Sequence, residues 1–64
     1  MSVKEQLENI IETLTTALPD ADKHDRGNSA AGTRVRKALQ SVKSAAQEAR
    51  ITVQNEKNTR WSYQ

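Results

Sequence analysis

The feature that most limits the fold of this chain is its small supply of large apolar side chains. In 64 residues there are eleven aliphatic residues larger than alanine, no phenylalanine and no cysteine. They are Val3, Leu7, Ile10, Ile11, Leu14, Leu18, Val35, Leu39, Val42, Ile51 and Val53. A domain of this length buries only about 60% of the surface that its unfolded chain exposes, and no disulfide can reinforce it. We therefore predict that copies of the chain associate, as a dimer or tetramer, to share one hydrophobic core.

The apolar residues of the first third recur with the spacing of an α-helix. Large aliphatic residues fall at positions 3, 7, 10, 11, 14 and 18, along one helical face. Ser2 and Glu5 match the S-x-x-E capping box that begins many helices. Pro19 disfavours helical geometry at the residue before it, so the helix is expected to stop or kink there, and a short extra helical turn can begin at Pro19. The sequence predicts a short helix over residues 3–18, followed by a turn-rich loop over residues 19–28.

A longer helix is predicted over about residues 29–58, with Asn28 or Ser29 as its cap. Its apolar residues alternate spacings of four and three, as in a coiled coil. They are Val35, Leu39, Val42, Ala46, Ala49 and Val53. At 1.5 Å per residue this helix spans roughly 45 Å and the first helix only about 25 Å. We therefore expect the seam from Ala46 to Val53 to pack on another subunit.

These elements define an all-α fold class, with a short first helix and a long second helix in one hairpin. Residues 1–58 form the single predicted domain, and residues 59–64 are predicted to be a flexible tail. Self-association of such hairpins gives an antiparallel helical bundle. No apolar run approaches the roughly 20 residues that cross a bilayer, and the N-terminus lacks the apolar core of a signal peptide. We expect a cytoplasmic protein without a membrane partner.

Acidic and basic residues are divided between the two halves of the chain. Residues 1–25 carry two basic and six acidic side chains, whereas residues 26–64 carry eight basic and two acidic ones. The formal net charge of +2 conceals this division. Such asymmetry predicts either an anionic partner or attraction between the two halves.

Basic residues of the second helix recur every seven residues and so lie along one line of the helix. This cationic row consists of Arg36, Lys43, Arg50 and Lys57. Three further cations lie at or just before the start of the same helix: Arg26, Arg34 and Lys37. A rigid row of cations can neutralise DNA phosphates and release counterions without reading bases. The alternative is that the row pairs with acidic residues of a neighbouring first helix, as flanking charges do in coiled coils; these are Glu5, Glu8 and Glu12.

Residues 26–37 carry a specific resemblance. They read Arg-Gly-Asn-Ser-Ala-Ala-Gly-Thr-Arg-Val-Arg-Lys, which closely resembles the (K/R)GN-x-AAGTR-x-RK motif of the bacterial histone-like family typified by the chlamydial linker-histone-like protein. The similarity extends more loosely over residues 34–53, and over the first helix as an amphipathic pattern. The resemblance implies a DNA-binding, nucleoid-associated protein. It assigns the family's basic character to positions 26, 34, 36 and 37.

The chlamydial members of this family carry a long Lys/Arg-rich tail after their helices. Here only Lys57 and Arg60 lie near the end of the chain, so we expect weak or oligomer-dependent DNA binding. Within the motif, Gly27 is expected to supply a positive-φ turn. The following helix N-terminus, beside Arg26 and Arg34, is a candidate anion site. The alternative is that the glycines and alanines only allow a tight helix–helix contact.

The remaining chemistry-bearing residues give weaker signals. His24 lies among aspartates, but their spacing does not fit a calcium loop, and a surface turn is the favoured interpretation. Trp61 and Tyr63 can stack on bases or, more commonly for terminal aromatics, pack on a neighbouring subunit. With one histidine and no cysteine, the chain is not expected to be an enzyme or to bind a cofactor, a metal or a small-molecule substrate.

The sequence therefore predicts a histone-like protein that organises a chromosome and binds DNA non-specifically through the basic face of its second helix. Its expected location is the bacterial nucleoid, or the host-cell cytoplasm if a phage encodes it. The alternative function is that of a structural adaptor, whose long helix binds another protein and whose charges form salt bridges between subunits.

Overall fold

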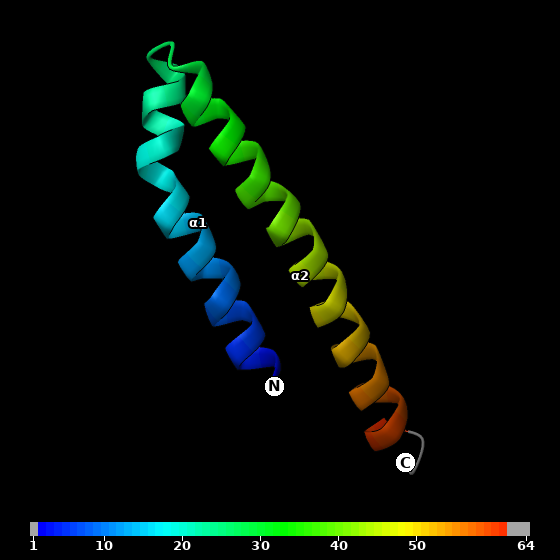
Figure 1. Ribbon diagram of the computed structural model, residues 1–64. Coiled ribbons are helices and arrows are strands. Elements are labelled where there is room, and N and C mark those ends of the chain that lie inside the picture. The colour runs from blue at the N-terminus through cyan, green and yellow to red at the C-terminus, as the bar shows by residue number, and fades with distance from the viewer. Residues whose placement is uncertain (1, 62–64) are drawn as a thin grey trace.

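The computed structural model describes residues 2–61, with side chains described up to residue 57. Within that range the chain forms two α-helices, α1 (Val3–Asp25) and α2 (Ser29–Trp61). The helices lie side by side and antiparallel as a hairpin (Figure 1), and the Cα atoms span 54 × 15 × 15 Å. The predicted all-α helical hairpin is confirmed.

The first helix is longer than the sequence predicted. It continues through Pro19 to Asp25, so the prediction of a helix over residues 3–18 and a loop over residues 19–28 was wrong. Proline removes one backbone hydrogen bond and crowds the preceding turn. The axis of α1 changes direction along its cyan stretch in Figure 1, and Pro19 lies inside this helix. The helix tolerates this disturbance because the residues after Pro19 gain contacts with α2.

The second helix also differs at its end. It extends to Trp61, so residues 59–61 of the predicted tail are helical, and residues 62–64 lie outside the described part of the chain. The start of α1 follows the sequence more closely. The Ser2 hydroxyl accepts a hydrogen bond of 3.1 Å from the backbone N–H of Glu5, as a helix-capping serine does.

Three residues, Arg26 to Asn28, form the whole connection between the helices. Gly27 has φ +101°, a left-handed conformation that glycine adopts without penalty from a Cβ. Its N–H bonds the carbonyl of His24 at 2.9 Å, and the N–H of Asn28 bonds the carbonyl of Lys23 at 3.0 Å. These two bonds form the Schellman motif, which satisfies the last carbonyls of a helix. Glycine at this position therefore ends α1 and turns the chain back.

Asn28 then begins α2. Its side-chain Oδ1 accepts a hydrogen bond of 3.0 Å from the N–H of Ala31, which is the usual contact of a helix N-cap. Of the two caps considered from the sequence, the structure selects Asn28. One dipeptide, Gly27-Asn28, thus terminates one helix and starts the next, and this explains why so short a connection suffices.

Replacing Gly27 by alanine is expected to lower the free energy of unfolding by about 1–2 kcal/mol, the cost of placing an L-residue in the left-handed region. A Cβ at this position would meet no atom within 4 Å, so the effect would come from the backbone alone. Thermal unfolding followed by circular dichroism measures it. Gly27→Asn is the control, because asparagine tolerates this conformation better than alanine; an equal loss in both variants would contradict the explanation.

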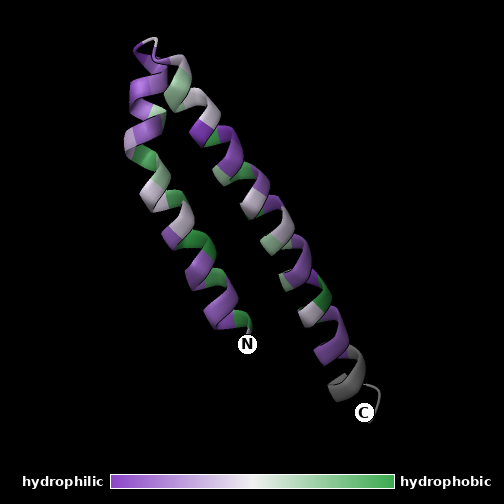
Figure 2. Cartoon of the chain, in the orientation of Figure 1, coloured by the Kyte–Doolittle hydropathy of each residue, from purple (hydrophilic) through white to green (hydrophobic). Residues whose placement is uncertain are grey.

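The face that α1 turns toward α2 is not the row of large aliphatic residues. Its half-buried side chains recur at spacings of three and four and include polar ones. They are Val3, Gln6, Ile10, Thr13, Ala17, Asp20 and Ala21. By contrast Leu7, Ile11, Leu14 and Leu18 are 40–65% exposed. The apolar stripe seen in the sequence is therefore only partly used within one chain (Figure 2 shows green, hydrophobic bands along α1).

The side of α2 that contacts α1 is built mainly from small residues. Every one of them is buried or half-buried. They are Ala31, Gly32, Val35, Ala38, Val42, Ala45, Ala46, Ala49 and Thr52. Among these, Ala31 is 0% and Ala49 is 6% exposed, and they are the buried hydrophobic residues of the described chain. The hairpin is thus held by close helix approach and contains no large buried side chain in its described part.

The far end of this contact corrects one further expectation. The Nε2 atom of Gln6 donates a hydrogen bond of 3.2 Å to the hydroxyl of Thr52, and Val3 and Leu7 line a groove together with Val53. The segment from Ala46 to Val53 therefore packs on α1 of its own chain. It does so because α1 extends to Asp25, close to the turn, so that the first residues of α1 lie beside the segment of α2 around Thr52. The difference in helix length is no longer an argument for a second subunit.

Candidate nucleic-acid interface

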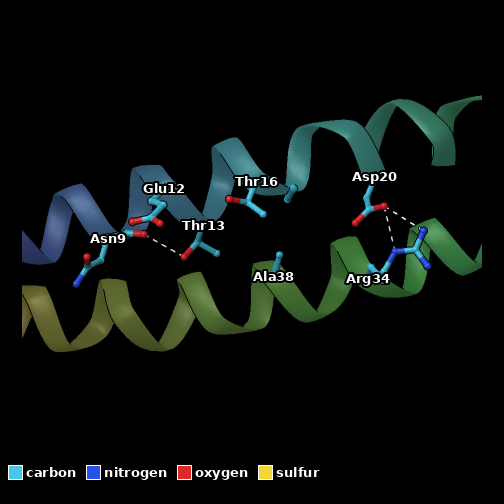
Figure 3. Close-up of a pocket in the computed structure, with 8 residues that line it drawn as sticks. Asn9, Glu12, Thr13, Thr16, Asp20, Arg34 and Ala38 are labelled. Atoms are coloured by element: carbon cyan, nitrogen blue, oxygen red, sulfur yellow. Dashed lines mark hydrogen bonds and ion pairs between the residues drawn. The ribbon is translucent and has the colours of Figure 1, made fainter.

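The seven cations proposed from the sequence fall into two groups, and the first lies at the turn end of the hairpin. Arg34 reaches across from α2 to Asp20 of α1: its Nε donates a hydrogen bond of 3.0 Å to Oδ1, and its terminal nitrogen lies 3.0 Å from the same oxygen. Figure 3 shows the two side chains pointing toward one another. Arg26 forms an ion pair of 3.3 Å with Asp22. Both cations are thus matched by a carboxylate of their own chain.

The Asp20–Arg34 pair closes one end of a polar groove between the helices. Its walls carry hydroxyl, amide and carboxylate groups (Figure 3). The groove is lined by Asn9, Glu12, Thr13, Thr16, Ala17, Asp20, Arg34 and Ala38. The groove contains one cation, Arg34, and two carboxylates, Glu12 and Asp20. Its net charge therefore does not favour an anionic ligand.

The second group of cations lies along α2, beyond its buried contact with α1. Every side chain in it is exposed. The group is the cationic row, Arg36, Lys43, Arg50 and Lys57, together with Lys37. Arg50 donates a hydrogen bond of 3.4 Å to the amide oxygen of Gln47. Among the described side chains, none of these five cations forms an ion pair, because the two ion pairs present involve Arg26 and Arg34.

The row has a regular geometry. Seven residues of α-helix rise about 10.5 Å, so the four cations extend over roughly 32 Å of α2 at 1.5 Å per residue. Arg36 and Lys37 flank a shallow hollow with Thr33 and Gln40. At the other end, Arg50 and Lys57 border an apolar groove. The cationic row therefore presents positive charges at regular intervals along α2.

The acidic residues considered as partners for the row lie elsewhere on the hairpin. Glu5, Glu8 and Glu12 are exposed on α1, and within the described side chains none of them pairs with a cation of α2. The Asp20–Arg34 pair is the link between an acidic α1 residue and a basic α2 residue in that part of the chain. Mutual attraction of the two halves thus acts at one point near the turn.

The glycine and alanine residues of the motif serve the helix–helix contact. A Cβ placed on Gly32 would lie 2.5 Å from Nδ1 of His24, so the imidazole ring of α1 rests directly on the backbone of α2. Ala31 is fully buried beside it. The N-terminus of α2 has fewer free N–H groups for an anion than the sequence predicted. The N–H of Ala31 and the N–H of Gly32 are already hydrogen-bonded to Asn28.

Several residues of this end were not recognised from the sequence. The sequence predicts a loop at Asp20, because Pro19 disfavours a continued helix. His24 was considered for metal binding; among the described side chains no group of three or more acidic or histidine residues is placed to hold a metal ion.

The side chain of Trp61, and all of Tyr63, lie outside what the structure describes. Within the described part, neither helix has an apolar stretch long enough for a bilayer crossing.

The fold and the charges define a class: a small all-α hairpin with an acidic first helix and a basic second helix whose exposed cations stand in a row. Comparison with protein families gives the narrower assignment. Residues 4–59 match the family of the histone H1-like protein Hc1, and the chain belongs to that family. No curated protein and no solved structure matches the chain.

Proposed function

We propose that this protein binds double-stranded DNA without sequence preference and acts as a histone-like component of the bacterial nucleoid. The observation that carries the proposal is the cationic row of α2, which is exposed and free of ion pairs among the described side chains. Cations in this state can replace the counterions condensed on the phosphate backbone, and the released ions supply the free energy of binding. Membership of a histone H1-like family supports DNA as the polyanion.

The structure also favours a division of roles among the seven candidate cations. Arg36, Lys37, Lys43, Arg50 and Lys57 carry the phosphate contacts in this proposal. Arg26 and Arg34 contribute less, because each must exchange an aspartate for a phosphate. Contacts to phosphate position a protein on the duplex but carry no base information. The proposed binding is therefore non-specific and non-catalytic, and it serves chromosome organisation in the nucleoid or in a phage-infected cytoplasm.

A second candidate function is that of an adaptor that binds another protein. The observation in its favour is the exposure of large aliphatic residues on α1, where Ile11 is 61% and Leu18 is 65% exposed. Exposed apolar surface of this kind commonly marks a protein-binding site. An adaptor would use this surface alone and would have no affinity for DNA.

Fluorescence anisotropy of a labelled duplex, measured between 50 and 300 mM salt, separates the two functions. If three or four cations of the row each neutralise one phosphate, the logarithm of the affinity should fall with the logarithm of salt concentration at a slope of about −3 to −4. Two duplexes of unrelated sequence should give equal affinities. Absence of binding at 50 mM salt would reject DNA binding and leave the adaptor.

A further inference from the structure

The side of α2 that faces away from α1 carries a shallow hollow, which we call the outer hollow. It is lined by Thr33, Arg36, Lys37 and Gln40, and all four side chains are exposed. Their spacing of three and four residues places them on one stripe of the helix. At 3.6 residues per turn, the middle of this stripe lies roughly 180° around the helix from the small residues that contact α1.

Every side chain of the outer hollow can donate hydrogen bonds. The guanidinium of Arg36 and the ammonium of Lys37 are charged donors, whereas Thr33 and Gln40 supply a neutral hydroxyl and a neutral amide. None of the described carboxylates lines the hollow. The nearest acidic residue along α2 is Glu48, eight residues beyond Gln40 and so about 12 Å away along the helix axis. The hollow therefore suits a negatively charged group that only accepts hydrogen bonds.

These donors are hardly used within the chain. Among the described residues, the side chains of Arg36, Lys37 and Gln40 form neither a hydrogen bond nor an ion pair. The hydroxyl of Thr33 donates to the carbonyl of Ser29 at 3.4 Å, which is long for a hydrogen bond between two oxygens. An incoming acceptor can therefore engage all four groups without first breaking an ion pair.

Three other grooves of the described hairpin lack this combination of groups. The polar groove of Figure 3 contains Glu12 and Asp20 beside its single cation. The groove that Arg50 and Lys57 border is lined mostly by apolar residues, and a third groove is lined by apolar residues alone. Of these four, the outer hollow is the one in which cations and neutral donors meet without a carboxylate or an apolar wall.

We propose that the outer hollow holds one backbone phosphate of the DNA duplex. In this arrangement Arg36 and Lys37 supply the charge, and the Thr33 hydroxyl and Gln40 amide donate hydrogen bonds to the phosphate oxygens. The inference rests on the proposed DNA binding, and it adds two neutral residues to the cations already assigned. Charged and neutral side chains commonly share the phosphate contacts of protein–DNA complexes.

The outer hollow also determines which side of the hairpin meets the duplex. A phosphate held there places the DNA against the side of α2 opposite α1. The cationic row reaches the same duplex from the edge of that side, because a seven-residue repeat drifts about 20° around the helix at each step. The apolar grooves between the two helices then remain clear of the DNA.

Removing the two neutral donors tests the proposal without changing the charge. The double variant Thr33→Val/Gln40→Met keeps side chains of similar size and leaves every cation in place. Its affinity for a labelled duplex should fall about 10-fold, the effect of losing two neutral hydrogen bonds. The salt slope should stay unchanged, because no charge that releases counterions is lost. Fluorescence anisotropy at several salt concentrations measures both quantities.

Two control variants separate this contact from a general effect of substitution. Thr33→Ser keeps the hydroxyl and should bind the duplex as the wild type does. Thr15→Val/Thr16→Val removes two hydroxyls from exposed positions of α1 and should leave the affinity nearly unchanged. Circular dichroism checks that all variants remain helical. Wild-type affinity in Thr33→Val/Gln40→Met, or an equal loss in the α1 variant, would overturn the proposal while leaving DNA binding itself in place.

Inorganic phosphate tests the outer hollow without DNA. In nuclear magnetic resonance spectra of the isotope-labelled chain, millimolar phosphate should shift the amide signals of residues 33–40 more than those around Lys43 and Arg50. The Thr33→Val/Gln40→Met variant should show smaller shifts. Equal shifts along the whole cationic row would contradict a defined phosphate site. Phosphate shifts in a chain that binds no duplex would mean that the hollow takes a free phosphate group, and would reject both this proposal and the proposed function.

Discussion

Replacing the four residues of the cationic row by glutamine is expected to lower the affinity for duplex DNA on the order of 10³-fold at 0.1 M salt. The figure follows if each cation neutralises one phosphate, because each such contact adds about 0.9 to the salt slope. The slope should become less negative by the same 0.9 for each residue replaced. Anisotropy titrations at several salt concentrations measure both quantities, and circular dichroism checks that the helices remain.

A matched pair of variants separates position from charge. Lys43→Gln/Arg50→Gln and Arg26→Gln/Arg34→Gln each remove two positive charges. The first pair takes them from the exposed row, and the second takes them from residues already paired with aspartates. We expect a loss of about 10²-fold for the row pair and clearly less for the turn pair. Equal losses would mean that total charge decides binding and that α2 presents no particular surface.

Replacing Ala31 by leucine is expected to lower the free energy of unfolding by about 1–3 kcal/mol, the usual cost of overpacking a filled interior. Ala31 is 0% exposed, in the first turn of α2. A leucine there would force the helices apart where Gly32 holds the ring of His24 and Asp20 holds Arg34. Thermal melts at one fixed protein concentration would show a fall of roughly 4–8 °C for each kcal/mol.

The neighbouring residue supplies the control. Ala30 is exposed, so Ala30→Leu adds the same atoms to the same helical turn without entering the contact. Its effect should stay within about 0.5 kcal/mol, as for most surface substitutions. If Ala31→Leu were as harmless as Ala30→Leu, close helix approach at the motif would not be what holds the hairpin.

The sequence was sufficient for the two helices and for their order. Apolar spacing and the Ser2 cap identified the start of α1, and the capping residues near Asn28 identified the start of α2. The predicted end of the first helix at Leu18 was wrong. The prediction considered only the effect of Pro19 on its neighbours in the sequence. The helix continues since Asp20 and the ring of His24 find partners on α2, and those partners become adjacent only once the chain has folded back.

The candidate site shows the same limit. Seven cations were visible in the sequence, and the four that recur every seven residues are all exposed on α2. No spacing rule revealed that Arg26 and Arg34 pair with Asp22 and Asp20. The motif that carries the family resemblance also proved to contain the turn and the tight helix contact, in addition to its basic residues.

The sequence by itself determined the helical hairpin, the division into an acidic and a basic helix, and the regular cationic row. These features depend on local preference and on helical periodicity, which are written in neighbouring residues. The tertiary structure decided which side of each helix faces inward. Small side chains on α2 allowed the two helices to approach closely at the half-buried α1 positions from Val3 to Ala21. The larger Leu7, Leu14 and Leu18 were therefore left beside this contact and remain exposed.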